Sequence, residues 1–371
     1  MKKLLIDCHI FDQNFQGIRT FLKGIIEELI ILKKHQLILV AHDTSNLQKE
    51  FGVHDNVTYV SFSTKNKFKR LIIELPRIIR KHDADFALFN YTAPFLKVRG
   101  CKYLTVLHDV LFLDYPEYFP RKYRLVHKLL FKQSIRSSEH ILTVSDYSRK
   151  RINFHFGLKL SSRNVIPNAV DKLFYNDVDK SVSKNKVNSK YALNDYILFV
   201  SRIEPRKNHQ ILIDWYIENS LHKKKIQLVF VGKFAFNEVE TRNYFEQLKI
   251  KTNNYFLHLE QVNNQDLFDL NNAAKVVVFP SLCEGFGIPP LESALLKTPT
   301  LVSNLSAMQD FSFFKEYHQD PKNSEFISKL NELILLNEGP HNTFLDECAK
   351  AIQNTYNWKT STSYLSKLID Q

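Results

Sequence analysis

Residues 276–292, VVVFPSLCEGFGIPPLE, predict a strand, a loop that contains two glycines, and the start of a helix. Val276–Phe279 is the strand, because a short run of β-branched and aromatic residues is typical of a buried strand. Pro290 suits the first turn of the following helix, where its missing N–H would have no partner inside the helix. The stretch therefore predicts one strand–loop–helix unit of an α/β sheet.

The same loop has the composition of an anion-binding site. Gly285 and Gly287 let the backbone approach a ligand closely, and the helix that follows turns its positive end toward the loop. Glu284 and Glu292 stand on either side of this segment, and their carboxylates can accept hydrogen bonds from ribose or sugar hydroxyls. We expect a phosphate and neighbouring hydroxyl groups to bind here.

A second candidate loop, Ser201–Asn208, follows the predicted strand Tyr196–Ser201 and opens a helix. Ligands of open α/β sheets bind at the carboxyl ends of the strands. Arg202 and Lys207 are suited to a pyrophosphate, Arg as a planar fork and Lys as a point charge. The two loops together predict a site for a phosphorylated ligand.

Short β-rich runs alternate with longer helical patterns along the chain, which predicts parallel sheets covered by helices. The pattern restarts near residue 196, so two successive doubly wound, Rossmann-like units are the simplest account. The predicted strands are Lys3–Cys8, Leu37–Ala41, Val57–Val60, Phe86–Phe89, Tyr103–Leu107, Ile141–Val144, Tyr196–Ser201, Gln227–Val231, Tyr255–Leu259, Val276–Phe279 and Thr300–Val302. The predicted helices are Gly17–Lys34, Lys67–His82, Arg121–Ser137, Asp146–Phe156, Gln210–Glu218, Glu238–Lys251, Gln265–Ala273, Pro290–Leu296 and Asn357–Leu368.

These patterns predict an N-terminal domain of residues 1–175 and a C-terminal domain of residues 190–355. Residues 356–371 form a terminal helical segment. The stretch Asp171–Ser189 is polar and lacks periodicity, so we interpret it as the linker or its flank.

The positive charge is concentrated in the first half of the chain. The net charge is +12, and residues 1–170 hold 28 of the 51 Lys and Arg but only 15 of the 39 Asp and Glu. A nucleic acid, an anionic membrane surface or a phosphorylated acceptor would each explain this excess.

Composition also predicts a cytoplasmic protein with free thiols. The cysteines, Cys8, Cys101, Cys283 and Cys348, form no CxxC pair and no zinc-like spacing. The N-terminal apolar run is too short for a signal peptide, and no stretch of about 18 uncharged apolar residues predicts a membrane span.

Two predicted helices of the first half mix Lys and Arg with large apolar residues. They are Lys65–Lys81, in which Pro76 predicts a kink, and Arg121–Arg136. Two interpretations remain: a solvated basic face on a helix packed against the sheet, or docking on anionic lipid at the inner face of the cytoplasmic membrane.

Residues 196–310 resemble the C-terminal domain of glycosyltransferase family 4, a large GT-B family. Its members carry an Arg…Lys-Asn loop, here Arg202 with Lys207-Asn208, and two glutamates with seven residues between them that include Gly-Phe-Gly, here Glu284 and Glu292. Further similarities are Val165–Val170, Leu228–Gly232, Gln261-Val262 before Asp266-Leu267, and Trp358 before the last helix. The resemblance implies a GT-B fold, in which two Rossmann-like domains face a cleft and the C-terminal helix crosses back to the N-domain.

This resemblance implies a role for each matching residue of the donor site. Arg202 and Lys207 would bind the diphosphate of the sugar donor, Glu292 the ribose hydroxyls, and Glu284 the transferred sugar. Further donor contacts would come from Gly285, Phe286, Gly287, Ile288 and, beside the base, Val262.

In the first half the resemblance is looser. His108-Asp109 follows the strand Tyr103–Leu107, where the family often has a His near the sugar, so His108 would join Glu284, Arg202 and Lys207 in catalysis. Gly17-Ile18-Arg19 resembles the family's first glycine loop beside the acceptor. That loop often has two glycines, whereas Asn14–Gly17 has one, and Gln309-Asp310 stands where many members have Pro-Glu.

The resemblance also implies the reaction. The configuration at the anomeric carbon would be retained through same-face attack, and Arg202, Lys207 and the helix after Gly287 would stabilise the leaving diphosphate without a metal ion. Asp83-Ala84-Asp85 has the letters of a metal motif but precedes a predicted strand, so we interpret it as a loop. We expect no resident cofactor, and the donor nucleotide (GDP, dTDP or UDP) stays open.

The function expected from these observations is transfer of a hexose, mannose or rhamnose-like, to a glycan or lipid-linked acceptor in bacterial surface polysaccharide or lipopolysaccharide synthesis. A GT-B phosphorylase or a nucleotide-sugar epimerase is the alternative. A nucleic-acid-binding protein is a distant one, because only the charge suggests it and no recognisable module is present. We expect no nucleic acid partner.

Overall fold

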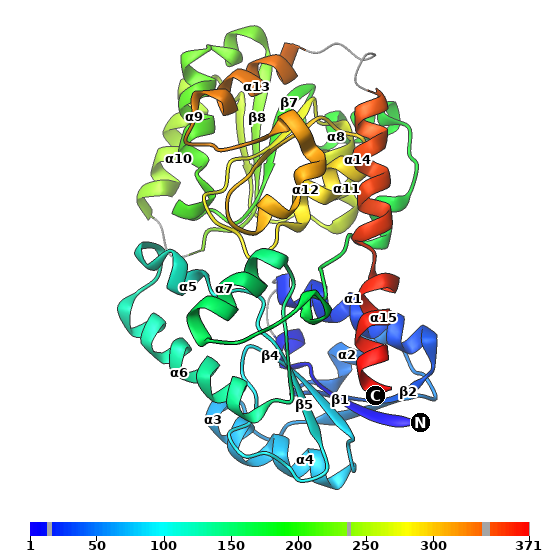
Figure 1. The fold of residues 1–371 in the computed structure, drawn as a ribbon. Coiled ribbons are helices and arrows are strands. Elements are labelled where there is room, and N and C mark those ends of the chain that lie inside the picture. The colour runs from blue at the N-terminus through cyan, green and yellow to red at the C-terminus, as the bar shows by residue number, and fades with distance from the viewer. Residues whose placement is uncertain (13–16, 236–238, 336–341, 371) are drawn as a thin grey trace. The chain divides into compact units, whose positions relative to one another are not determined.

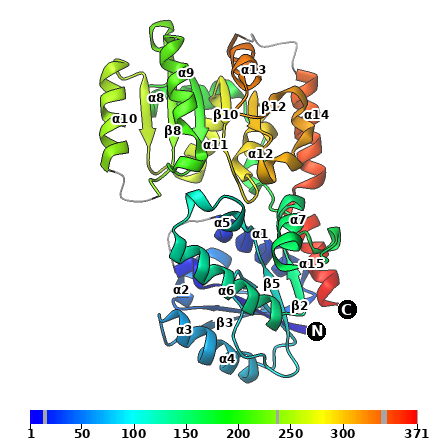
Figure 2. The same cartoon turned by 60° about the vertical axis from the view of Figure 1, so that its left-hand side comes forward.

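The computed structural model describes residues 1–12, 17–235, 239–335 and 342–370. The chain forms two compact units, Met1–Ala169 with Tyr356–Gln371 and Val170–Thr355. Each unit has, within the described residues, one parallel six-stranded sheet with helices on both faces (Figures 1 and 2). The predicted class, two doubly wound α/β units, is therefore confirmed.

The sheet of the first unit has the strand order β3-β2-β1-β4-β5-β6. Strands β2 and β3 follow one another on one side of β1, whereas β4, β5 and β6 follow one another on its other side. The direction in which successive strands are added to the sheet therefore reverses between β1 and β4. The strands are β1 (Lys2–Asp7), β2 (His35–Ala41), β3 (Val57–Ser61), β4 (Phe86–Asn90), β5 (Lys102–Val106) and β6 (His140–Leu142). The helices are α1 (Gly17–Leu32), α2 (Thr44–Phe51), α3 (Lys67–Lys69), α4 (Leu75–Lys81), α5 (Leu111–Asp114), α6 (Arg121–Ser137), α7 (Asp146–Phe156) and α15 (Trp358–Ile369).

The sheet of the second unit has the order β12-β11-β10-β7-β8-β9, and its reversal lies between β7 and β10. The strands are β7 (Asp195–Val200), β8 (Ile226–Val231), β9 (Phe256–Leu259), β10 (Val276–Phe279), β11 (Thr300–Ser303) and β12 (His318–Gln319). The helices are α8 (Lys180–Tyr191), α9 (His209–Glu218), α10 (Val239–Lys251), α11 (Asn264–Ala273), α12 (Ile288–Leu295), α13 (Ser324–Leu335) and α14 (Asn342–Thr355).

The central strands form where the sequence is continuously apolar. Every residue of β10 is buried, and Val277 pairs in parallel with Leu198 of β7 on one side and with Thr300 of β11 on the other. A strand covered on both faces has no polar face, which explains why unbroken apolar runs predict it.

The segment Asp171–Ser189, interpreted as the linker or its flank, directly follows the boundary between the units at Ala169, but it is not irregular throughout, because α8 begins at Lys180. This helix packs against α11 through its few buried residues, Ser183 and Val187. The Ser183 hydroxyl donates a hydrogen bond of 2.7 Å to the buried Asp269 carboxylate. Tertiary contacts of this kind stabilise a helix whose sequence alone has little apolar periodicity.

The predicted helix Lys67–His82 is present but is not continuous. A π-helical turn, η2 (Arg70–Glu74), separates α3 from α4, and Pro76 is the second residue of α4. Because Pro76 has no N–H, it cannot bond to the carbonyl four residues earlier, and the turn before it widens.

Helix α15 packs against α1 within the first unit (Figure 1). A side chain at Gly24 would place its Cβ 2.1 Å from the indole ring of Trp358, so only glycine permits this close approach. Ser361 adds a hydrogen bond of 2.8 Å to the carbonyl of Pro167. The predicted return of the C-terminal helix to the N-domain is confirmed.

The four cysteines are buried and form no disulfide bond, as predicted. Among the described residues, the helices lack the length and hydropathy that crossing a membrane requires.

Candidate functional site

In the second unit, two loops meet where the strand order of the sheet reverses. The loop after β7 contains a short 3-10 turn, Pro205–Lys207, and the loop after β10 leads to α12. The Leu282 N–H donates to the carbonyl of Arg206 at 2.8 Å, and the Arg206 guanidinium donates to the carbonyl of Cys283 at 2.8 Å. Such a reversal point at the carboxyl ends of the strands is where open α/β sheets bind ligands.

Glu284 joins the two loops through a cluster of charged groups. One carboxylate oxygen pairs with Lys207 and accepts a hydrogen bond of 3.0 Å from the Ser281 hydroxyl, and the other lies 3.2 Å from Arg206. The Lys207 and Glu284 side chains are 12% and 14% exposed, so solvent screens their pairing only weakly. The backbone N–H of Glu284 also donates to Ser306 at 2.7 Å, which fixes the start of the loop.

The electrostatics of this cluster keep its carboxylate ionised. Burial alone would raise the pKa of Glu284, but the charges of Lys207 and Arg206 outweigh burial and hold the pKa below its ordinary value. Burial lowers the pKa of Lys207, and Glu284 opposes that shift. Because Glu204 accepts a 2.6 Å bond from Arg206, positive and negative groups alternate through the cluster. An incoming phosphate would share Lys207 with Glu284.

Arg206 is a cluster residue that sequence analysis missed, because the resemblance assigned the arginine role to Arg202. The structure records Arg202 as exposed, with one long contact of 3.5 Å to the carbonyl of Ala235. The one signal in the sequence for the pairing of Arg206 with Glu284 is its position next to Lys207, in a turn that begins at Pro205. No contact among the described residues joins Arg202 to the Glu284 cluster.

The start of α12 offers a partial anion site. Gly287 precedes the helix with a φ of +104°, and a Cβ there would lie 3.1 Å from Met308. Both constraints favour glycine. Pro289 and Pro290 lack N–H groups, so the donors at this helix end are the N–H groups of Gly287 and Ile288, together with the helix dipole.

Glu292, in α12, is a buried carboxylate of a different kind. It is 8% exposed, and burial, reinforced by the charge of Asp171, raises its pKa to about 8. No hydrogen bond or ion pair to its carboxylate is recorded among the described residues. A buried acid without protein partners is suited to hydroxyl groups of a ligand. No recorded contact in the described part of the chain joins Glu292 to Lys207 or Glu284.

The remaining predicted donor residues lie in the same loops or on the same edge of the sheet. Phe286 is buried and its ring packs edge-on against Phe311, with 5.5 Å between centroids, so its backbone is the part available to a ligand. Val262 is half-buried in the loop between β9 and α11. Gly232, which follows β8, approaches the carbonyl of Ser201 so closely that a Cβ would lie 2.0 Å from it.

In the first unit, His108 lies just beyond the carboxyl end of β5. Its Nε2 atom is 2.8 Å from the Asn90 side-chain oxygen, and its ring packs edge-on against Phe21 at 5.1 Å. Burial lowers the pKa of His108 to about 3, so the imidazole is neutral at physiological pH. His108 can therefore exchange hydrogen bonds with a sugar but does not supply a positive charge there. Asn90, which sequence analysis missed, orients it.

The other predicted acceptor-side residues have structural partners. Asp109 accepts hydrogen bonds from the Tyr91 hydroxyl at 3.0 Å and from the N–H of Leu111 at 3.1 Å, and so anchors α5. Arg19 pairs with Glu50 at 2.7 Å. Gly17 starts α1 with open space around it, and the neighbouring residues Asn14–Gln16 lie outside the described part of the chain.

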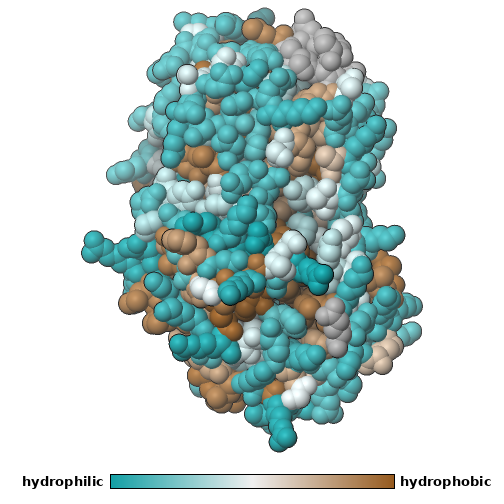
Figure 3. All heavy atoms as spheres, viewed as in Figure 1, coloured by the Kyte–Doolittle hydropathy of each residue, from teal (hydrophilic) through white to brown (hydrophobic). Residues whose placement is uncertain are grey.

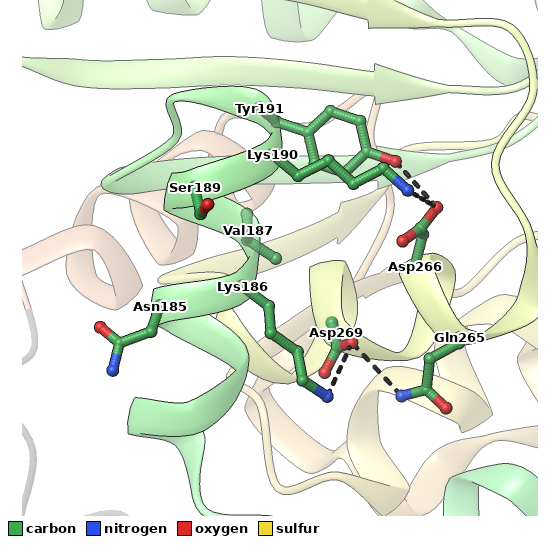
Figure 4. Close-up of a pocket in the computed structure, with 9 residues that line it drawn as sticks. All are labelled: Asn185, Lys186, Val187, Ser189, Lys190, Tyr191, Gln265, Asp266 and Asp269. Carbon is green, nitrogen blue, oxygen red and sulfur yellow. Dashed lines mark hydrogen bonds and ion pairs between the residues drawn. The ribbon is translucent and has the colours of Figure 1, made fainter.

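A hollow of about 540 Å³ lies between α8 and α11 (Figure 4), and no residue of either loop lines it. Its charged groups point toward one another: Lys190 lies 2.6 Å from Asp266, and Lys186 lies 3.5 Å from Asp269. Since these charges are already paired and no predicted site residue lines the hollow, we do not assign it to the site.

The raised pKa of Glu292 predicts how the free energy of unfolding depends on pH. Its carboxyl pKa is raised in the folded chain, so the folded state binds more protons than the unfolded state between about pH 4.5 and 8. The free energy of unfolding should therefore fall by a few kcal/mol as pH rises through this window. Glu292→Gln should remove that fall. Denaturant titrations of both proteins at pH 5, 6.5 and 8 measure the difference, and parallel pH profiles would contradict the assignment.

Comparisons with known proteins match both halves of the chain. Residues 182–358 match the family model "Glycosyl transferases group 1" and residues 15–172 match "Glycosyltransferase Family 4". The chain is 28% identical over 270 residues to O-antigen chain mannosyltransferase B of Escherichia coli, an alignment that covers 70% of this chain and 69% of that one. It is also 28% identical over 222 residues to O-antigen chain mannosyltransferase RfbU of Salmonella typhimurium, covering 60% and 56%.

Solved structures share the fold at low sequence identity. A sucrose-phosphate synthase from Thermosynechococcus elongatus aligns over 100% of this chain and 99% of its own, with a TM-score of 0.76 and 15% identity. Anabaena HepE in complex with UDP-glucose aligns over 100% of both chains, with a TM-score of 0.74 and 16% identity. The predicted GT-B architecture is confirmed. Since the two family models together span residues 15–358 except 173–181, the chain belongs to the glycosyltransferases, with a family 4 N-terminal part and a group 1 C-terminal part.

Proposed function

We propose that this chain transfers mannose from a nucleoside-diphosphate donor to a growing bacterial surface glycan of the lipopolysaccharide type. Two relatives that match most of the chain are named O-antigen chain mannosyltransferases, which supports mannose over a rhamnose-like sugar. GDP-mannose is accordingly the first donor to test, with dTDP- and UDP-sugars as comparisons.

The observation that carries the proposal is the pairing of Lys207 with Glu284 at the sheet reversal of the second unit. We assign the donor diphosphate to Lys207, to the exposed Arg202 and to the N-terminal end of α12, which together offer positive charge to a leaving phosphate. Glu284, held by Arg206, would accept hydrogen bonds from the sugar. Glu292 would accept them from the ribose.

We propose retention of configuration without a metal ion. The C1–O bond to the donor phosphate breaks while the acceptor hydroxyl forms a new C1–O bond on the same face of the sugar. The acceptor proton passes to the departing phosphate oxygen. Charge stabilisation by cationic side chains is sufficient in principle, because such groups act strongly in a partly dry site. The resemblance to glycosyltransferase family 4 supports this scheme.

The alternatives predict different products. A phosphorylase would release a sugar phosphate from a glycan when inorganic phosphate is supplied, and an epimerase would convert the nucleotide sugar without any acceptor. No observation on the site favours either of them over transfer.

The function is tested by incubating the protein with GDP-mannose and a mannose-containing glycan acceptor in the presence of EDTA. We expect transfer of one or more α-linked mannoses, detected by mass spectrometry and by NMR of the new anomeric proton. Lys207→Met should lower turnover by about 100-fold or more. Lys224→Met serves as the control, because it removes an exposed charge outside both site loops. A β-linked product, or loss of activity with EDTA, would contradict the proposed mechanism.

We also propose that the first unit docks on an anionic membrane, where a lipid-linked acceptor would be found. Leu125 and Leu129 of α6 are 63% and 59% exposed, and Phe68 of α3 is 55% exposed. Figure 3 shows such apolar side chains among hydrophilic ones over this region. Exposed apolar groups surrounded by Lys and Arg suit the surface of an anionic bilayer.

Sedimentation with vesicles tests the docking. At low salt the protein should sediment with vesicles that contain anionic lipid, and high salt should release it, because salt screens the attraction. Leu129→Asp should weaken the binding, whereas Val182→Asp, at an exposed position of α8 in the second unit, should not. If the unaltered protein stays in the supernatant at low salt, the docking proposal is wrong.

A further inference from the structure

Arg70 is a largely buried cation of the first unit whose side chain has no recorded hydrogen bond to any described residue. Its side chain is 12% exposed, and its Nε atom is enclosed by protein without a partner. The nearest carboxylate oxygen, on Asp7, lies 3.8 Å away, beyond hydrogen-bond distance. A guanidinium has five N–H donors, and leaving even the one at Nε unpaired in the interior costs free energy. The position of Arg70 therefore indicates a missing ligand.

The topology places this arginine at a ligand-binding position. Asp7 is the last residue of β1, which lies beside β4 where the strand order of the first sheet reverses. Ligands of open α/β sheets bind at this point. Arg70 itself opens the π-helical turn η2, and such turns are frequent at functional sites.

Neighbouring groups contact the Arg70 guanidinium without accepting hydrogen bonds from it. His9 lies 2.9 Å from the Asp7 carboxylate, on the oxygen that Arg70 does not approach. Burial would raise the pKa of Asp7, but His9 and Arg70 outweigh it and lower the pKa to about 2, so the carboxylate is ionised. The guanidinium carbon lies 5.7 Å from the centre of the Phe62 ring, which gives it a flat support.

Two further donors narrow the chemistry of the ligand. Lys67, which is exposed, lies three residues before Arg70, and desolvation beside the guanidinium lowers its pKa. Asn90, which ends β4, has a buried side-chain nitrogen with no partner among the described residues. A carboxylate would bind the paired N–H groups of the arginine alone. A phosphate has enough oxygens and negative charge to bind the arginine and the lysine together.

We propose that Arg70, with Lys67 and Asn90, binds a phosphate or diphosphate group of the glycosyl acceptor. This proposal rests on the proposed transferase function for the identity of the molecule that carries the phosphate. The anion site itself does not depend on that function. Arg70 would position the acceptor and would take no part in breaking the bond to the donor.

Binding of inorganic diphosphate tests the site directly. Inorganic diphosphate is titrated by calorimetry into the full chain carrying Lys207→Met. This substitution weakens the proposed donor site, so that the remaining binding reports on the first unit. Adding Arg70→Gln should weaken the remaining binding about tenfold or more, because charge-assisted hydrogen bonds are lost. Adding Arg77→Gln instead removes an exposed charge of α4 and should change the dissociation constant less than twofold. Equal weakening by both, or none by Arg70→Gln, would overturn the proposal.

Acceptor kinetics separate the sources of the phosphate. With Arg70→Gln, the KM for a diphosphate-lipid-linked acceptor should rise about tenfold. The KM of a phosphate-free glycan acceptor and of the donor should stay unchanged. A rise for a phosphorylated soluble glycan as well would show that the phosphate, and not the lipid, is recognised. A rise with the phosphate-free acceptor too would contradict phosphate recognition.

A folding control keeps the test decisive. Thermal unfolding of Arg70→Gln is measured first, and if that variant does not fold, Arg70→Lys replaces it. Lys keeps the charge but lacks the planar fork, so diphosphate binding should still weaken severalfold. Unchanged binding in Arg70→Lys would then count against the site. Should transfer fail with every donor while diphosphate binding depends on Arg70, the proposed function is wrong and the anion site stands.

Discussion

The ion pair between Lys207 and Glu284 ties the loop after β7 to the loop after β10, and the candidate donor site depends on it. Removing one partner of a largely buried pair leaves an uncompensated charge, which typically costs 3–5 kcal/mol. Arg206 shares the carboxylate, so Glu284 has a second cationic partner besides Lys207. The pair therefore stabilises the two loops, and in the proposed function it holds a cation where the donor diphosphate would bind.

The two units follow one plan but differ in how their charges are satisfied. In each sheet, charged residues stand where the strand order reverses, at the carboxyl ends of the strands. In the second unit Lys207 has its carboxylate partner, whereas in the first unit the Arg70 side chain has no recorded hydrogen bond among the described residues. Glu292 is also without a recorded partner in the described part of the chain. A buried group without a partner at a strand-order reversal is consistent with the substrate positions that we propose.

Sequence was sufficient for most of the fold, because strands buried on both faces are continuous apolar runs; Val276–Phe279 was predicted to the residue. It missed α8, whose stability comes from contacts with α11 and not from its own periodicity. In the site, the two loops could be predicted because parallel strands end at one edge. The sequence could not show which arginine pairs with Glu284, because the turn that begins at Pro205 brings Arg206, and not Arg202, to the carboxylate. Arg70 could not be predicted either, because folding brings it to Asp7 from a distant part of the sequence.

The most direct measurement is the dissociation constant of the nucleoside diphosphate, by calorimetry, for the unaltered protein, Lys207→Met, Glu284→Gln and the double variant. If Lys207 carries the diphosphate and Glu284 merely shares it, Lys207→Met weakens binding about 10- to 100-fold. Glu284→Gln then leaves binding equal or tighter, because the amide oxygen can still accept hydrogen bonds that hold the loops together while the competing charge is gone. Unchanged binding by Lys207→Met would contradict the account.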